Sequence, residues 1–183
     1  AATLEPGNAS PLIGAAEILL LARKFDDAAA QATAALDRTT DKDTDARAAA
    51  HEILARVALA RRDASIARTE AALAQEANPA RPVTAFVEAR VLHDQGKYDD
   101  ALPVFEKVVA DSRKNSTPIP ELHFYFGETL SRLNRRQEAI QQFAEEVRHF
   151  PENTRARASL ATLYQGTGQS ELADSTIGVM MRA

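Results

Sequence analysis

The sequence contains no cysteine, no tryptophan and few aromatic residues of any kind, only 5% of 183 residues. Without cysteine, disulfide bonds, thiolate metal sites and a cysteine nucleophile are excluded, although reducing and oxidising compartments both remain open. Because aromatics are so few, the apolar fraction consists mostly of alanine and other small residues. Such residues suit closely packed helices better than the faces of a sheet, so the composition predicts an all-α protein.

A strong charge of one sign and long apolar runs are also missing. The formal net charge is −4 and the pI is about 5.6, so no overall attraction to nucleic acid or anionic lipid is expected. The apolar stretch from Ile18 to Ala22 is far shorter than the ~20 residues of a membrane span, and Arg23 and Lys24 follow it directly. We therefore expect neither nucleic-acid binding nor membrane insertion, and the sequence leaves the cellular compartment unknown.

The sequence does contain an internal repeat. Five alanines, which we term the anchor alanines, are spaced by 39, 34, 38 and 34 residues: Ala28, Ala67, Ala101, Ala139 and Ala173. Counted from each anchor, repeat position −12 also holds a small residue in every unit: Ala16, Ala55, Ala89, Gly127 and Ala161. Small residues at both positions let the two helices of a hairpin approach closely, while larger apolar residues fill the space between successive hairpins.

Further repeat positions follow the same frame. Position −5, where a tight turn needs a residue that tolerates left-handed backbone angles, holds glycine or asparagine in three of five units. Its occupants are Arg23, Arg62, Gly96, Asn134 and Gly168. Position +4 is apolar throughout, with Ala32, Ala71, Phe105, Phe143 and Ile177. Position +12 is proline in the second and fourth units.

The frame and the capping residues together predict ten helices. We expect Ser10, Pro82, Pro120 and Asn153 or Thr154 to mark the starts of first helices. The predicted ranges are 11–23, 26–38, 46–61, 63–77, 82–95, 98–113, 120–133, 136–149, 154–166 and 170–182. The extra residues of the two long spacings fall between units, at 39–45 and 112–119, where insertions cost least.

The segments from Gly96 to Phe105 and from Gly127 to Pro151 resemble the tetratricopeptide repeat. The resemblance covers essentially the whole chain and implies a right-handed α-α superhelix of about ten antiparallel helices. It implies a single array over residues 1–183, with units at roughly 9–45, 46–81, 82–118, 119–153 and 154–183. The chain departs from the family at position −16, usually a large aromatic, which holds Leu12, His51, Ala85, His123 and Arg157.

Both ends of the sequence look unfinished for such an array. Residues Glu5 to Asn8 resemble the closing loop of a preceding unit, and Ile177, Met180 and Met181 are apolar where solenoids usually carry a polar capping helix. We expect the chain to be a fragment of a longer bacterial protein. The alternative is a homo-oligomer in which the uncapped ends of two chains pair.

The resemblance also implies that the first helices line a concave groove, through positions −15, −14, −11, −8 and −7, and that the groove binds a protein or peptide. The residues placed there are richest in the third and fourth units: Phe86, Arg90, His93, Phe124, Tyr125, Glu128 and Arg132. Aromatics and arginine dominate binding energy at interfaces. Phe86 and Phe124 could instead pack between neighbouring helices, and the sequence leaves both possibilities open. The Lys and Asn pattern by which some family members hold a C-terminal carboxylate is missing.

No catalytic or metal-binding pattern accompanies the repeat. The zinc-protease helix motif, the glycine-rich phosphate loop and the serine nucleophile elbow are all missing, and the four histidines are scattered. Asp41, Asp43 and Asp45 have the spacing of a calcium loop, but Ala46 stands where that loop needs glycine. Acidic residues before a helix are favoured by capping alone, which is the better interpretation. We therefore expect no enzyme, no metal and no cofactor.

The function that these observations favour is an interaction scaffold for a protein or peptide. One alternative is an arm appended to a bacterial enzyme, because residues 122–127 and 155–160 resemble repeat arms attached to bacterial hydrolases, including sulfatase-like ones. The other alternative is a self-assembly module that acts through the open ends.

Overall fold

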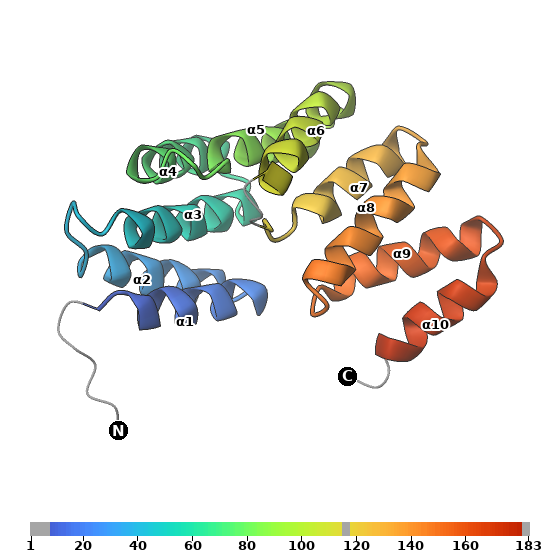
Figure 1. Cartoon of the computed structure of the whole chain (residues 1–183), viewed down its shortest axis with the longest axis horizontal. Helices are drawn as coiled ribbons and strands as arrows, with labels where there is room; N and C mark the ends of the chain where they lie inside the picture. The colour runs from blue at the N-terminus through green and yellow to red at the C-terminus, as the bar shows by residue number, and fades with distance from the viewer. Residues whose placement is uncertain (1–7, 115–117, 181–183) are drawn as a thin grey trace. The chain divides into compact units, whose positions relative to one another are not determined.

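The computed structural model describes residues 8–114 and 118–180, and every regular element within these ranges is an α-helix (Figure 1). The helices are α1 (Ser10–Leu21), α2 (Phe25–Leu36), α3 (Thr44–Ala60), α4 (Ala64–Ala77), α5 (Val83–Asp94), α6 (Tyr98–Lys114), α7 (Leu122–Arg132), α8 (Arg136–His149), α9 (Thr154–Gly166) and α10 (Ser170–Met180). The all-α class is confirmed, and each helix lies within two residues of its predicted bounds. Among these helices, none combines the length and apolar character that a membrane span requires.

The turns inside the five hairpins share one conformation. Position −5 adopts left-handed backbone angles in every unit, with φ values of 58°, 61°, 75°, 60° and 77° at Arg23, Arg62, Gly96, Asn134 and Gly168. The following N–H then bonds to the carbonyl five residues before it, as in Lys24 to Leu19 at 2.9 Å and Asp63 to Ala58 at 2.9 Å. This Schellman arrangement satisfies the last carbonyls of the first helix. The predicted turn position is confirmed even where arginine occupies it.

The starts of the helices agree less closely with the predicted capping residues. Asn153 caps α9 as predicted, because its side chain accepts the N–H of Ala156 at 3.1 Å. Ser10, by contrast, lies inside α1, whose N-cap is Ala9. Pro120 does not open α7 either, since the N-cap is Glu121 with a left-handed φ of 66°. A buried carboxylate that binds the Glu121 backbone explains this shift and is described below.

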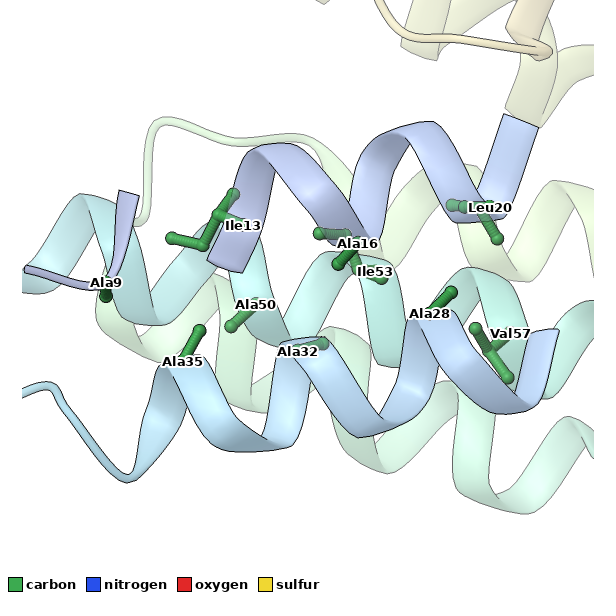
Figure 2. Packing of buried hydrophobic residues seen from close by; sticks show 10 residues of the cluster. All are labelled: Ala9, Ile13, Ala16, Leu20, Ala28, Ala32, Ala35, Ala50, Ile53 and Val57. Carbon is green, nitrogen blue, oxygen red and sulfur yellow. The ribbon is translucent and has the colours of Figure 1, made fainter. Parts of the chain in front are cut away.

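The described helices group into two compact units that divide between Val91 and Leu92. In the N-terminal unit, α1, α2 and α3 share one core cluster (Figure 2). Its members are Ala9, Ile13, Ala16, Leu20, Ala28, Ala32, Ala35, Ala50, Ile53 and Val57. The three cluster alanines on α2, Ala28, Ala32 and Ala35, are fully buried, so the helices meet through short side chains, as the repeat frame predicts.

A second cluster in the same unit joins α3, α4 and α5. It contains Ala55, Ala58, Leu59, Ala67, Ala71, Ala74, Val83, Val87 and Val91. In this unit, α2 and α4 thus each pack against the first helix of their own hairpin and the first helix of the next. This nearest-neighbour stacking is the source of stability in solenoids.

The C-terminal unit uses larger side chains at the same repeat positions. Phe105 of α6 stacks on Phe126 of α7 with ring centroids 5.8 Å apart and an interplanar angle of 15°. Phe143 of α8 meets Phe124 of α7 at 5.8 Å. Gly127 on α7 faces the Phe143 ring, so a small residue at position −12 makes room for the large one at +4.

Part of what we expected at the ends lies outside the described residues. This applies to residues 5–7 and to the side chains of Met180 and Met181. Ile177, the third apolar residue predicted there, is 41% exposed. The single array over residues 1–183 and its unit boundaries stay predictions.

Candidate functional site

The seven predicted groove residues fall on both sides of the division between the compact units. Phe86 and Arg90 belong to the N-terminal unit, on α5. The other five belong to the C-terminal unit: His93 at the end of α5, and Phe124, Tyr125, Glu128 and Arg132 on α7. The candidate site is therefore built from the five residues of the C-terminal unit, and Phe86 and Arg90 are described separately.

The aromatic side chains among them are buried. Phe86 and Phe124 are each 2% exposed, so they pack between helices, which is the second of the two possibilities that the sequence left open. Tyr125 is 6% exposed. Arg90 and Glu128 are partly buried, and Arg132 is exposed. The exposed surface at these residues therefore consists of the polar ends of side chains more than of the phenylalanine rings.

Polar side chains form a stripe along α7. Glu121, Tyr125, Glu128 and Arg132 follow one another at intervals of four, three and four residues, which places them on one face of the helix. Glu121 and Glu128 are partly exposed, and Arg132 is exposed. Two carboxylates, a tyrosine hydroxyl and one guanidinium thus follow one another along a single helix face.

Arg155, in the first turn of α9, covers the aromatic pair at the start of this stripe. Its guanidinium lies 4.3 Å from the centroid of the Phe124 ring and donates a hydrogen bond to the Tyr125 hydroxyl at 3.2 Å. The Glu121 carboxylate lies 3.9 Å from the same guanidinium. The Arg155 side chain keeps 44% of its surface exposed. Cation–π contact and hydrogen bonding therefore hold an arginine in a defined position at the surface.

Arg155 is not among the groove residues predicted from the sequence. Its position is −18, before the repeat positions that the resemblance assigns to the groove. Two features of the sequence could have indicated it: Arg155 lies at the predicted start of the first helix of the fifth unit, and the same helix of the fourth unit carries the adjacent aromatics Phe124 and Tyr125. We define the α7–α9 face as Glu121, Tyr125, Glu128, Arg132 and Arg155.

His93 is buried beneath this face and contacts two residues of α7, Thr129 and Tyr125. Its Nδ1 lies 3.0 Å from the Thr129 hydroxyl, and its ring makes edge contacts with Tyr98 and Tyr125, both at 5.5 Å between centroids. His93 is itself buried. The ring therefore positions Tyr125 from within and contributes little surface of its own.

A buried carboxylate fixes the start of α7. Glu146 of α8 is fully buried and accepts hydrogen bonds from the backbone N–H of Glu121 at 2.8 Å, from that of Phe124 at 3.2 Å and from the Asn153 amide at 2.9 Å. Burial raises the pKa of Glu146, with these hydrogen bonds acting in the opposite direction. The side chain thus connects the starts of α7 and α9, the two helices that carry the candidate face.

Two other histidines join the helices of their hairpins through equivalent contacts. His51 Nδ1 lies 2.8 Å from the Glu70 carboxylate, and His123 Nδ1 lies 2.7 Å from the Gln142 side-chain oxygen. Both pairs connect position −16 to position +3. Burial lowers the pKa of His123. The polar pair replaces the large aromatic that the family usually carries at position −16, so both histidines are structural.

The acidic residues with calcium-loop spacing have separate protein partners. Asp43 accepts hydrogen bonds from the Thr40 N–H and hydroxyl, each at 2.8 Å, and these lower its pKa. Asp45 accepts from the Asn78 amide at 2.6 Å, and Asp41 lies 3.4 Å from Arg47. Over residues 8–114 and 118–180, three or more His, Cys, Asp or Glu side chains gather nowhere closely enough to hold a metal ion.

An open pocket of about 510 Å³ lies in the N-terminal unit, between α1 and the start of α3. On its wall, Ile13, Gly14 and Glu17 occupy repeat positions that the resemblance assigns to the groove. The other lining residues are Ser10, Lys42, Asp43, Thr44, Asp45, Ala46 and Ala49. The wall has neither an aromatic nor an arginine, the residue types that dominate interface energies, so the α7–α9 face is the stronger candidate.

Residues 86–153 match a family model described as tetratricopeptide repeat. This segment contains most of α5 and all of α6, α7 and α8. No curated protein matches the chain.

Three solved structures are similar to the chain over most of their lengths. A MamA RS-1 double mutant gives a TM-score of 0.53 at 17% identity, covering 95% of this chain and 93% of the other. Kinesin light chain repeats from Podospora anserina give 0.50 at 16% identity, covering 98% and 96%. YrrB, described as a TPR protein with an unusual peptide-binding site, gives 0.49 at 22% identity, covering 95% and 85%. At these identities the likeness concerns the fold.

Proposed function

We propose that this chain, a tetratricopeptide repeat protein by its matched segment and its fold, is a scaffold that binds a protein or peptide through the α7–α9 face. The proposal takes residues 1–183 as one array of five hairpins. Its support is that the same turn conformation and the same buried anchor alanine recur in all five hairpins.

One observation supports the choice of face more than any other: a half-exposed arginine lies on a buried aromatic pair. Arg155 is held over Phe124 and bonded to Tyr125, so its orientation is set before a partner arrives. Preorganised side chains lose less conformational entropy on binding. Arginine and tyrosine are also the residue types most often found at binding hot spots.

The side chains around Arg155 are polar or charged, so they could bind the backbone and the charged side chains of a peptide. On α7, Glu128 and Arg132 offer charges of both signs. On α9, Ser159 and Thr162 follow Arg155 at intervals of four and three residues, which puts them on the same helix face. A peptide laid across these two helices would meet hydrogen-bond donors and acceptors along its length.

The alternative of an arm appended to an enzyme gains no support from the comparisons. The matched family model and the two structures with TM-scores of 0.50 and 0.53 are described by their repeats or as MamA, and none of these descriptions names a hydrolase. The scaffold proposal therefore stands on the α7–α9 face and on the family resemblance of the central helices.

The test is to select peptides that bind the wild-type chain from a random display library and to measure the affinity of each for variants. We expect Arg155→Ala to weaken binding by about 2 kcal/mol, or roughly thirtyfold, as for a hot-spot residue. The matched control is Arg148→Ala, which removes an arginine from α8 that pairs with Glu145 one turn earlier.

Circular dichroism and thermal melting would show whether both variants remain folded. If the selected peptides bind Arg155→Ala as tightly as the wild type, the α7–α9 face is not the binding site. If Arg148→Ala weakens binding to the same degree as Arg155→Ala, the effect is not specific to this face.

A further inference from the structure

Arg155 bonds to the rest of the chain through one corner of its guanidinium. Nη1 donates to the Tyr125 hydroxyl at 3.2 Å and lies 3.9 Å from a carboxylate oxygen of Glu121. Within the part of the chain that the structure describes, the other two nitrogens, Nε and Nη2, donate no hydrogen bond. The side chain keeps 44% of its surface exposed. Solvent or a partner therefore supplies the acceptors for this Nε–Nη2 edge.

Two other arginines show what the same edge binds within this chain. Nε and Nη2 of Arg68 donate to the two carboxylate oxygens of Glu88 at 2.8 and 3.2 Å. Nε and Nη2 of Arg135 donate to those of Glu138 at 2.7 and 2.6 Å. Each pair forms the two parallel bonds for which a planar guanidinium and a carboxylate match in shape. Arg155 presents the same edge, and none of the described carboxylates occupies it.

The contacts with Phe124 and Tyr125 fix the plane of the guanidinium. Its central carbon lies 4.3 Å from the centroid of the Phe124 ring and 5.6 Å from that of Tyr125. The rings hold one face of the group, and the hydroxyl holds Nη1. A ligand that accepts two parallel bonds must lie in this plane, so its orientation is set before it binds.

The neighbouring charges favour a ligand with one negative charge over a ligand with two. Glu121 lies 3.9 Å from the guanidinium, and Glu128 follows it on the same face of α7. Like charges repel, and the repulsion grows with the charge of the ligand. A carboxylate carries one negative charge, whereas the phosphate of a phosphorylated residue carries nearly two at neutral pH.

The polar positions of α9 indicate that the carboxylate comes from a side chain. Ser159 follows Arg155 by one turn, about 6 Å along the helix. A peptide backbone can lie over this turn while an acidic side chain reaches back to Arg155. The pairs with Glu88 and Glu138 are likewise formed by side-chain carboxylates.

We infer that the peptide bound on the α7–α9 face presents an aspartate or glutamate side chain, whose carboxylate accepts hydrogen bonds from Nε and Nη2 of Arg155. This assignment rests on the proposed function of the face and adds the chemistry that its partner must carry. The partner is thus a peptide with an acidic residue at one fixed position.

The test uses peptides selected on the wild-type chain from a random display library. Each is synthesised with every Asp changed in turn to Asn and every Glu to Gln. Further versions carry an amidated C-terminus, or phosphoserine in place of the acidic residue. Isothermal titration calorimetry measures the affinity of each peptide for the wild type, Arg155→Gln, Arg155→Lys and the control Arg148→Gln, whose arginine pairs with Glu145. Circular dichroism and thermal melting show whether the variants are folded.

We expect one acidic position in each peptide at which the neutral amide weakens binding to the wild type by roughly tenfold. For Arg155→Gln the same change should cost less than about twofold, because the carboxylate has already lost its partner. Arg148→Gln should keep the tenfold effect. Arg155→Lys should show an intermediate effect, since lysine keeps the charge and cannot form the two parallel bonds. Amidation of the C-terminus should leave the affinity unchanged.

Four results would overturn the inference and leave the α7–α9 face as the binding site. The first is a set of selected peptides without acidic residues that still depends on Arg155. The second is an amide change that costs the wild type and Arg155→Gln equally at every acidic position. In the third, only amidation of the C-terminus weakens binding, which would assign the carboxylate to the chain end. In the fourth, phosphoserine binds more tightly than the acidic residue. If Arg155→Gln binds every peptide as tightly as the wild type does, the proposed function itself is wrong.

Discussion

Gly127 on α7 and Phe143 on α8 approach so closely that a Cβ atom built on the glycine would lie 2.9 Å from the Phe143 ring. The ring is nearly fully buried and also contacts Phe124, so it has little freedom to move away. Position −12 of the fourth hairpin therefore requires the smallest residue, whereas the other four hairpins carry alanine there. Because position −12 carries no side chain, α7 can approach α8 closely although position +4 holds the large Phe143 ring.

Gly127→Ala should therefore lower the free energy of unfolding, despite the better helix propensity of alanine. We expect a loss of about 1 to 3 kcal/mol from overpacking against Phe143. The matched control is Gly14→Ala on α1, where an added Cβ would meet nothing within 4 Å. That change should raise the free energy by about 0.5 to 1 kcal/mol. Urea unfolding measures both, and a Gly127→Ala variant as stable as the wild type would contradict the packing described.

Arg62 carries left-handed backbone angles that cost a residue with a Cβ about 1 to 2 kcal/mol relative to glycine. Arg62→Gly should raise the free energy of unfolding, by up to about 1 kcal/mol once the greater freedom of glycine in the unfolded chain is subtracted. Arg62→Ala separates the two effects, because it removes the side chain and keeps the strain. The thermal midpoint should rise for glycine only; equal midpoints for both variants would disprove the strain.

Glu146 should make stability depend on pH. Its folded-state pKa is raised by burial, so its contribution to the free energy of unfolding is fully present below the unfolded pKa, near 4.5, and is lost as the pH rises through the folded value. The stability of the wild type relative to Glu146→Gln should therefore fall as the pH rises from about 4 to about 8. Urea unfolding across this range measures the difference, and a pH-independent difference would contradict the raised pKa.

His123 acts in the opposite direction and must be separated from Glu146. Its folded-state pKa is lowered by burial, so its contribution is present above the unfolded pKa, near 6.5, and is lost as the pH falls through the lower folded value. Both the wild type and Glu146→Gln contain His123. Its effect therefore cancels in the difference between them, which leaves the slope that belongs to Glu146.

The sequence was sufficient to predict the helices and their turns, because those depend on local spacing. The repeat frame placed position −5 in the turn even at Arg23 and Arg62, although arginine itself gives no sign of left-handed backbone angles. The other three units supplied that sign through Gly96, Asn134 and Gly168. A residue can thus be assigned correctly from its equivalents when its own type is uninformative.

The start of α7 and the centre of the candidate site could not be predicted in this way. The N-cap at Glu121 depends on Glu146, which lies 25 residues later and reaches the backbone only after α8 has folded against α7. Arg155 is 30 residues from Tyr125, and their contact depends on how α9 packs on α7. Likewise, the sequence could not decide whether Phe124 faces the groove or the core, because both environments accept an aromatic ring.

The most direct test of the α7–α9 face as a binding site is photo-crosslinking to a peptide selected on the wild-type chain. A photoreactive phenylalanine is placed at Ser159 on α9, beside Arg155, or at Glu145 on α8. Each labelled chain is irradiated with the peptide, and the products are measured by mass spectrometry. We expect crosslinks from position 159 and none from position 145; crosslinks from position 145 alone would show that the peptide binds elsewhere and would contradict the proposed function.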